Sequence, residues 1–260
     1  MRYLKHVEQL KCFFSQKGAT NDNIMDRKNF IKKGLVGIGA LTTIPTFLTS
    51  CSKEEINASD LFDSSESSNA SATDSSDSCT ISPSETEGPY PIKTPAQYVR
   101  ENIVSDRTGV AMLMIINVQD ASNGCIPLEG VLVDVWHCDK DGNYSQYNNY
   151  TSANFLRGRQ TTDGNGQVSF ISIFPGWYRG RAPHVHIEIS DTNGSSLLVS
   201  QIAFPKDIYT EVYNSSGYNG APDTSNEQDN IFSDSLSQNM ADDVSGNTTD
   251  GYTLAKTIVV

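Results

Sequence analysis

The stretch Tyr178-Arg-Gly-Arg-Ala-Pro-His184-Val-His186 sets the fold expected of this chain, because it leads into an alternating run typical of a β-strand over residues 182–189. Side chains of a strand alternate between faces at about 3.3 Å per residue, so His184 and His186 would share one face with Cα atoms roughly 7 Å apart. The chain holds only 4 His. Two imidazoles on one strand face can share a metal ion; two ordinary half-buried strand histidines are the alternative.

Further short segments rich in Val and Ile, separated by Gly, Asn and Asp turns, predict strands at 110–118, 131–137, 167–174, 197–204 and 252–260. No amphipathic helix is expected between them. This spacing predicts an all-β fold, an antiparallel β-sandwich with long loops over residues 79–260. The polar excursion at 208–247 is expected to form surface loops with one short helix around 231–240.

Composition narrows the class of protein. The chain has 260 residues, 37% of them hydrophobic, which is enough to bury a substantial core and excludes both a wholly disordered chain and a membrane bundle. The formal net charge of -12 argues against a nucleic-acid partner, whose phosphates require a basic surface.

Residues 25–51 are typical of a bacterial export signal: a basic start, an apolar run over 34–48, and the ending Leu48-Thr-Ser-Cys51. The apolar run is too short to span a bilayer core of roughly 30 Å. Its last four residues resemble a lipobox, so Cys51 is expected to carry a lipid. The protein is then exported and held only by a lipid anchor, periplasmic or at the cell surface. A buried hydrophobic helix with an incidental Cys51 is the alternative.

The segments around this signal carry expectations of their own. Arg27-Lys-Asn-Phe-Ile-Lys32 resembles a twin-arginine signal with one Arg replaced by Lys, which leaves the general secretory and twin-arginine routes both open. Residues 1–24 precede the signal and are interpreted as a non-native extension, with Met25 as the start. Residues 52–78 are rich in Ser, Asp and Glu and predict a disordered tether.

The 5 Cys divide by position. Cys12 would lie outside the mature chain, and Cys51 would be lipidated. In an exported protein the other three favour a disulfide. Cys79 and Cys125 both lie at loop edges outside predicted strands and are the expected pair. Cys138 is interpreted as a packed thiol, with a metal-ligand role as the alternative.

Four linked motifs point to one family: Leu128-Glu-Gly-Val-Leu-Val-Asp-Val-Trp-His-Cys-Asp-Lys-Asp-Gly-Asn-Tyr144, Arg157-Gly-Arg-Gln-Thr-Thr-Asp, Phe174-Pro-Gly-Trp-Tyr178 and Arg181-Ala-Pro-His-Val-His186. Over residues 79–205 the chain resembles the intradiol ring-cleavage dioxygenases, the family of catechol and protocatechuate dioxygenases. The resemblance implies a prealbumin-like β-sandwich. It also implies a non-haem Fe(III) held by Tyr144, Tyr178, His184 and His186.

The chemistry of these donors supports the metal independently. Phenolate is a hard anionic ligand, so two phenolates with two imidazoles favour Fe(III), whereas zinc prefers Cys, carboxylate or a third His. Tyr147 and Tyr150 offer alternatives to Tyr144, but the Asp-x-Asp-Gly-x-Tyr pattern favours Tyr144. His137 has no ligand counterpart in the family and is interpreted as structural.

The resemblance implies further roles. Arg181 would stabilise negative charge on the substrate ring, Gln201 would lie near the substrate, and Gly88-Pro89-Tyr90 would line the pocket. The reaction implied is cleavage of an aromatic vicinal diol of the catechol, protocatechuate or hydroxyquinol class by O2 to a muconate-type dicarboxylate. A transthyretin-like lipoprotein that binds iron or catecholates without cleavage is one alternative, and a metal-free structural domain is another. A homo-oligomer is left open.

Overall fold

The computed structural model describes residues 79–215 and 217–260. The expectations for residues 1–24, 25–51 and 52–78, including lipidation of Cys51, therefore lie outside the described residues. Within the described part, no helix combines the length and the apolar character needed to cross a membrane.

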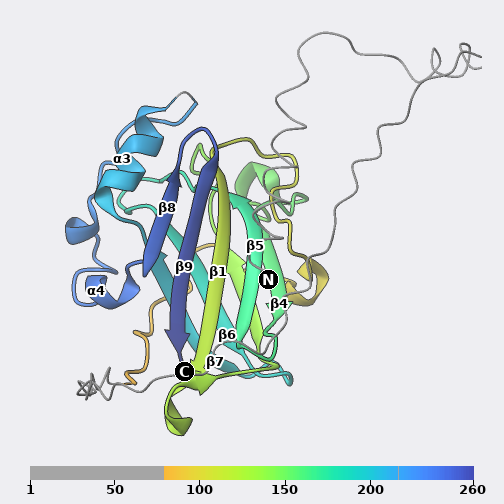
Figure 1. Ribbon diagram of the computed structural model, residues 1–260. Helices are drawn as coiled ribbons and strands as arrows, with labels where there is room; N and C mark the ends of the chain where they lie inside the picture. Colours follow the sequence, from red (N-terminus) through yellow and green to blue (C-terminus); the bar gives the residue numbers. More distant parts are fainter. Residues whose placement is uncertain (1–78, 216) are drawn as a thin grey trace, which may run out of the picture. The chain divides into compact units, whose positions relative to one another are not determined.

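Two β-sheets pack face to face, with β6 and β7 behind β1 and β9 in Figure 1. One sheet contains β2 (Ile126–Pro127), β1 (Ala111–Asp120), β9 (Gly251–Val259) and β8 (Asp243–Asn247), with β5 (Gln167–Ile173) also paired to β1. The other has the order β4 (Arg157–Thr161), β3 (Leu132–Trp136), β6 (His184–Ser190) and β7 (Ser196–Ala203). The predicted all-β sandwich is confirmed, and the six predicted strands correspond to β1, β3, β5, β6, β7 and β9.

One strand pair runs in a different sense from the rest. β1 and β9 are parallel, with Met112 opposite Tyr252, whereas the other named pairs are antiparallel. After the long segment that follows β7, the chain enters β9 at the end of the sheet where β1 begins, and a parallel pair requires such a crossover. β2, β4 and β8 were not predicted, because their sequences lack a run of apolar residues.

The excursion after β7 is more ordered than predicted. It contains α3 (Lys206–Asn214) and α4 (Leu236–Asn239), and only α4 falls in the range expected for a helix. The expectation of loops over the first part of 208–247 was wrong, because Tyr209, Val212 and Tyr213 lie on one face of α3 and are buried. No side chain caps the start of α3, so the usual sequence signal of a helix N-terminus is missing. Four short 3-10 helices complete the elements of residues 79–215 and 217–260: η2 (Pro95–Tyr98), η3 (Ala121–Asn123), η4 (Asn148–Tyr150) and η5 (Asn226–Gln228).

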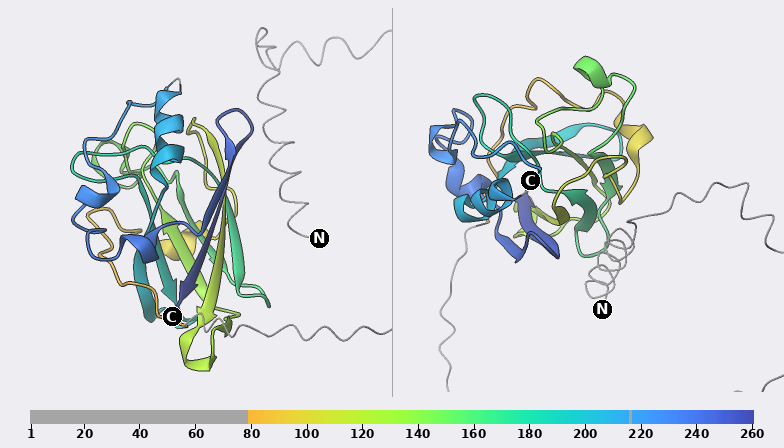
Figure 2. Two further views of the ribbon diagram at one scale, coloured as in Figure 1. Left: turned by 60° about the vertical axis from the view of Figure 1, so that its left-hand side comes forward. Right: turned by 90° about the horizontal axis from the view of Figure 1, so that it is seen from above.

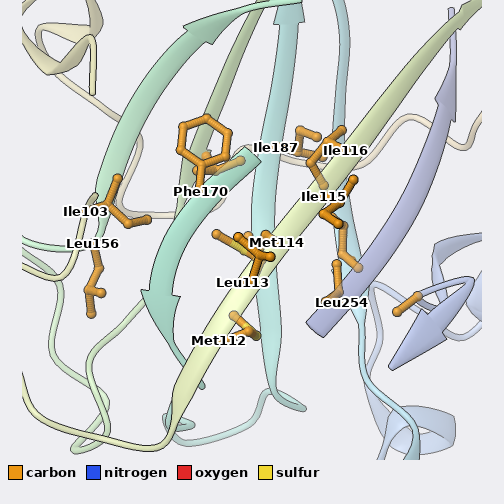
Figure 3. Close-up of a cluster of buried hydrophobic side chains, with 14 of the residues drawn as sticks. Ile103, Met112, Leu113, Met114, Ile115, Ile116, Leu156, Phe170, Ile187 and Leu254 are labelled. Carbon is orange, nitrogen blue, oxygen red and sulfur yellow. The ribbon is translucent and has the colours of Figure 1, made fainter. Parts of the chain in front are cut away.

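The main core lies between the sheets. Figure 3 shows side chains from β1, such as Met114, close to Phe170 of β5 and Ile187 of β6. On β6, Val185, Ile187 and Ile189 all belong to this core. The intervening residues of β6 must therefore point away from the core, to the outer face of the four-stranded sheet. That outer face carries both histidines of the H-x-H motif.

Cys79 and Cys125 form a disulfide, with Cα atoms 5.6 Å apart. This is the pair expected from their positions at loop edges. It ties the first described residue to the turn that follows η3. Cys138 is a free, buried thiol.

Candidate active site

A row of four side chains crosses the outer face of the four-stranded sheet. The register places Arg157 of β4 opposite Trp136 of β3, Trp136 opposite His186 of β6, and His186 opposite Gln201 of β7. Residues directly opposite in antiparallel strands project from the same face. All four side chains are buried, because the segment from residue 79 and the loop after β3 lie over this side of the sheet in the view from above (Figure 2).

His184 and His186 face each other at the centre of this surface. Their Nε2 atoms lie 3.1 Å apart. The His184 Nδ1–H donates to the carbonyl oxygen of Ala182 at 2.6 Å, so the His184 Nε2 carries a free lone pair. The His186 ring stacks on Trp136 with centroids 5.0 Å apart. Its Nδ1 is buried and has no hydrogen-bond partner among the described groups.

Gly88 closes the other side of His186. A Cβ atom at this position would lie 2.8 Å from His186 Cε1, and the backbone φ of +70° is one that other residues rarely adopt. The Gly88-Pro89-Tyr90 segment is therefore in contact with the site, as the resemblance implied for a pocket lining. Tyr90 stacks on Tyr144, with ring centroids 4.7 Å apart.

Two loops bring the tyrosines together. In the first, Asp139 folds the chain by accepting the backbone N–H groups of Asp141 at 3.0 Å and Asn143 at 2.8 Å. Gly142 has a φ of +85°, and a Cβ there would lie 2.5 Å from the carbonyl oxygen of Trp177 in the second loop. This close approach requires glycine, and it places Tyr144 and Tyr178 side by side.

The two phenols reach the histidines. The rings of Tyr144 and Tyr178 lie 5.8 Å apart, and the Tyr178 ring lies 5.6 Å from His184. The Tyr144 hydroxyl lies 3.5 Å from His184 Nε2. Burial raises the pKa of Tyr144 well above its ordinary value and also raises the pKa of Tyr178. Without a cation, both phenols are therefore protonated at neutral pH.

The histidines are neutral. Burial, with a further contribution from the Arg181 charge, lowers the pKa of His184 to about 3. Burial lowers the pKa of His186 well below its usual range, and the neighbouring His184 and Arg181 act in the same direction. Both imidazoles therefore offer lone pairs at neutral pH, as metal ligands must.

The spacing of three donors, in Tyr144, His184 and His186, fits one metal ion. Two ligands at about 2.1 Å from an ion and about 90–120° apart lie roughly 3.0–3.6 Å from each other. The separations of 3.1 and 3.5 Å at His184 Nε2 fall in that range. In the described ranges, no three His, Cys, Asp or Glu residues are grouped as a metal site, so a metal here depends on the tyrosines.

Arg181 lies at the edge of this donor set. Its Nη1–H donates to the Tyr178 hydroxyl at 3.4 Å, and its Nη2–H donates to Gln201 Oε1 at 2.5 Å. Its Nε–H donates to the carboxylate of Asp229, which is fully buried. Sequence reasoning did not identify Asp229, because it lies in a polar segment 48 residues after Arg181 with no motif around it.

Arg157 is the other residue whose part in the site was missed. Its Nη2–H donates to the Ser145 carbonyl at 2.7 Å, its Nε–H to the Ser145 hydroxyl at 2.9 Å, and its Nη1–H to the Tyr90 carbonyl at 3.0 Å. The guanidinium thus joins the residue after Tyr144 to the segment that lines the site. In the sequence, Arg157 stood out only as the first residue of the Arg157–Asp163 motif, with no role of its own.

The alternative ligands lie elsewhere. The Tyr147 hydroxyl donates to the Pro91 carbonyl at 2.9 Å, and Tyr150 packs edge-on against Phe155. His137 is buried and lies within hydrogen-bond distance of the Cys138 carbonyl and the Ser172 hydroxyl. Cys138 packs in the aromatic cluster of Trp136 and Tyr144. The structure therefore groups Tyr144, Tyr178, His184 and His186 and leaves the other candidates outside the donor set.

Comparisons with known proteins bear on this arrangement. Residues 86–216, half of the chain, match a family model described as "Dioxygenase". The chain is 30% identical over 127 residues to chlorocatechol 1,2-dioxygenase from Rhodococcus opacus, covering 41% of this chain and 48% of that protein. It is 29% identical over 119 residues to the protocatechuate 3,4-dioxygenase beta chain from Burkholderia cepacia, covering 41% and 51%. The matches thus span about half the length of these curated relatives.

A solved structure is similar over a larger share. The intradiol ring-cleavage dioxygenase from Tetranychus urticae superposes with a TM-score of 0.63 at 31% identity, covering 70% of this chain and 94% of that chain. The dioxygenase domain of a carbohydrate-binding fusion protein from Streptomyces sp. SirexAA-E is 26% identical, with a TM-score of 0.52 over 70% of this chain and 98% of that chain. With the family match and these similarities, the chain belongs to the intradiol ring-cleavage dioxygenase family.

Proposed function

We propose that this chain is a non-haem Fe(III) dioxygenase that cleaves an aromatic vicinal diol between its two hydroxylated carbons with O2, giving a muconate-type dicarboxylate. The observation that carries the proposal is the convergence of two phenols and two neutral imidazoles on one point of the outer sheet face. Such a donor set matches a hard trivalent ion. Membership of the family supports the reaction class.

The four donors would hold the ion: Tyr144, Tyr178, His184 and His186. A bound ferric ion would supply the Lewis acidity that stabilises the phenolates and makes the ring of a chelated diol reactive toward O2. Burial raises the pKa of Tyr144 and of Tyr178, so the positive charge of the ion would be needed to hold both as phenolates. The Ala182 carbonyl fixes the tautomer of His184 so that the Nε2 lone pair would be available to the ion.

Charge and shape at the site fit an aromatic diol. The Arg181 guanidinium lies next to the Tyr178 hydroxyl and would stabilise negative charge that develops on the substrate ring. Gln201 holds that guanidinium from the β7 side. Tyr90 and Gly88 cover the donors from the side opposite the sheet. The curated relatives are named for chlorocatechol and protocatechuate, and we propose a substrate of the same catechol class.

We also propose export and lipid anchoring at Cys51. The support is the basic start, the short apolar run and the lipobox-like ending of residues 25–51. Radiolabelled palmitate supplied to expressing bacteria should label the wild-type chain and leave Cys51→Ser unlabelled. Equal labelling of both would contradict this part of the proposal.

The visible spectrum of the ferric-loaded full chain, recorded with catechol or protocatechuate first without and then with air, tests the enzyme. A tyrosinate-to-iron charge-transfer band should shift when the diol binds and change again as O2 is consumed, and 18O2 should place two labelled oxygen atoms in the acid product. Tyr144→Phe and Tyr178→Phe should weaken or move the band, whereas Tyr209→Phe on α3 should not. A shifted band with no O2 uptake would favour a binding protein, and the absence of a band would contradict the iron site.

A further inference from the structure

Asp229 is a buried carboxylate that accepts hydrogen bonds from three groups beside the site. It is fully buried, and its oxygens accept from Arg181 Nε–H at 2.8 and 3.1 Å, from the Ala182 N–H at 2.7 Å and from the Ile231 N–H at 2.9 Å. A buried carboxylate held by several N–H donors has a single favoured orientation. The contact with the Ile231 N–H is local to the segment of Asp229 and does not depend on Arg181.

The contacts of Arg181 show what this carboxylate orients. Gln201 holds Nη2, and the Tyr178 hydroxyl lies near Nη1 at the longer distance of 3.4 Å. Only Asp229 holds the Nε edge of the guanidinium within the part of the chain that the structure describes. An arginine side chain carries several rotatable bonds, so each contact narrows the orientations open to its guanidinium. The Asp229 contact adds a charged partner at the Nε edge.

The same carboxylate also reaches the H-x-H strand. It accepts the Ala182 N–H, and the carbonyl of Ala182 accepts from His184 Nδ1–H at 2.6 Å. One group thus sets the position of a proposed catalytic arginine relative to a proposed metal ligand. Gln201 is anchored separately, through its Nε2–H to the Thr86 carbonyl at 2.8 Å.

We propose that Asp229 is a positioning residue for ring cleavage: it aims the Arg181 guanidinium at the substrate and pairs its charge, without touching substrate or metal itself. This inference rests on the proposed function. It assigns a part in the site to the segment between η5 and α4, which carries none of the motif residues. Removing a residue that orients a group at a metal site typically lowers activity about 10- to 100-fold.

A double-mutant cycle in the ferric-loaded full chain separates positioning from general support, using Asp229→Asn, Arg181→Gln and the two combined. If Asp229 acts through Arg181, Asp229→Asn lowers kcat about 10- to 100-fold with an unchanged iron content, and the combined variant is no slower than Arg181→Gln alone. Asp223→Asn is the matched control, because Asp223 lies a few residues earlier, before η5, and accepts only from the Gly180 N–H among the donors near the site; it should keep wild-type kcat.

The result that overturns the proposal is wild-type kcat in Asp229→Asn, or a combined variant slower than Arg181→Gln by the full factor of the second substitution. If Asp229→Asn folds poorly because it leaves Arg181 unpaired, the combined variant, which has no unpaired charge, still decides between these outcomes by comparison with Arg181→Gln. If Asp229→Asn binds less iron but keeps near-wild-type kcat per bound iron, the proposal is also overturned, because the effect then acts through His184 and not through Arg181.

A second readout needs no turnover. In the metal-free chain, the 15N–1H resonance of Arg181 Nε–H should be resolved and slow to exchange in the wild type and in Asp223→Asn, and it should broaden or exchange rapidly in Asp229→Asn. Unchanged exchange in Asp229→Asn would overturn the positioning role. If the wild type binds catechol without consuming O2, the ring-cleavage proposal fails instead, and this resonance still reports whether Asp229 fixes Arg181.

Discussion

At the scale of single residues, Arg157 is the most unusual group at the site. It is completely buried, and no carboxylate within the described ranges forms an ion pair with it. Burial lowers its pKa to about 10, which measures the cost of taking a cation out of water and still leaves it charged at neutral pH. Its hydrogen bonds to Ser145 and to the Tyr90 carbonyl are what hold it there.

Arg157→Lys should weaken both iron binding and the fold. An ammonium group cannot reproduce the planar arrangement of donors, so at least one buried carbonyl of Ser145 or Tyr90 loses its partner. We expect the unfolding free energy to fall by about 1–3 kcal/mol, measured by urea titration, and iron affinity to fall roughly tenfold, measured by competition with a chelator. Arg179→Lys at an exposed position is the control, and an equal effect in both variants would contradict the prediction.

His137 should make the stability of the fold depend on pH. Burial lowers its pKa to about 4, the Cys138 carbonyl opposes this shift, and the charge of Arg157 adds to it. In the unfolded chain His137 binds a proton below about pH 6.5, whereas in the folded chain it binds one only below about pH 4. The unfolding free energy therefore falls as the pH decreases through this window, by up to about 3 kcal/mol. Urea unfolding of the wild type and His137→Gln between about pH 7 and pH 5 checks it. The difference between the two should change with pH; a constant difference would count against this assignment.

At the scale of elements, the site depends on the contact between the loop after β3 and the loop after β5, which meet at Gly142. Gly142 allows the loop after β3 to touch the Trp177 carbonyl, and this contact brings Tyr144 beside Tyr178. The strand part of the site is rigid by comparison, because its four side chains share one register across the sheet. Small changes in the loop contact should therefore alter the tyrosines before the histidines.

Gly142→Ala should separate the tyrosines, and Gly180→Ala provides a matched comparison. Both glycines have a positive φ, +85° and +81°, so each substitution carries a left-handed strain of about 1–2 kcal/mol. Only at position 142 does the new Cβ meet backbone, 2.5 Å from the Trp177 oxygen, whereas nothing lies within 4 Å at position 180. We expect a larger loss of unfolding free energy and a shifted charge-transfer band in Gly142→Ala alone. Identical spectra would contradict this.

Some of the strands and site residues could be predicted from the sequence, and others could not. Strands such as β1 and β6 were predictable because runs of Val and Ile alternate along them, and the tyrosine and histidine candidates were predictable because they lie in short motifs. α3 was missed because it lacks a capping residue, and β4 because its sequence is polar. Asp229 could not be found at all. Its role arises from a contact across 48 residues, which only the folded chain creates.

At the scale of the whole molecule, the Cys79–Cys125 disulfide closes a loop of 46 residues. In the chain-entropy account this stabilises the fold by about 4 kcal/mol, because the unfolded chain loses freedom. The variant Cys79→Ser with Cys125→Ser should therefore unfold at a lower temperature, and reductant should lower the unfolding temperature of the wild type but not of the variant. Scanning calorimetry checks both. A variant that remains sensitive to reductant would show that this disulfide is not the source of the effect.

The row formed by Arg157, Trp136, His186 and Gln201 limits how the chain can change in length. A single residue inserted between His184 and Val185 would turn every later side chain of β6 to the opposite face, placing His186 toward the core and Val185 among the metal donors. Insertions in the loops after β3 and β7 leave that alternation intact. Length can therefore vary in these loops without rebuilding the sheet, as long as Gly142 and Tyr144 keep their contacts with the loop that carries Trp177 and Tyr178.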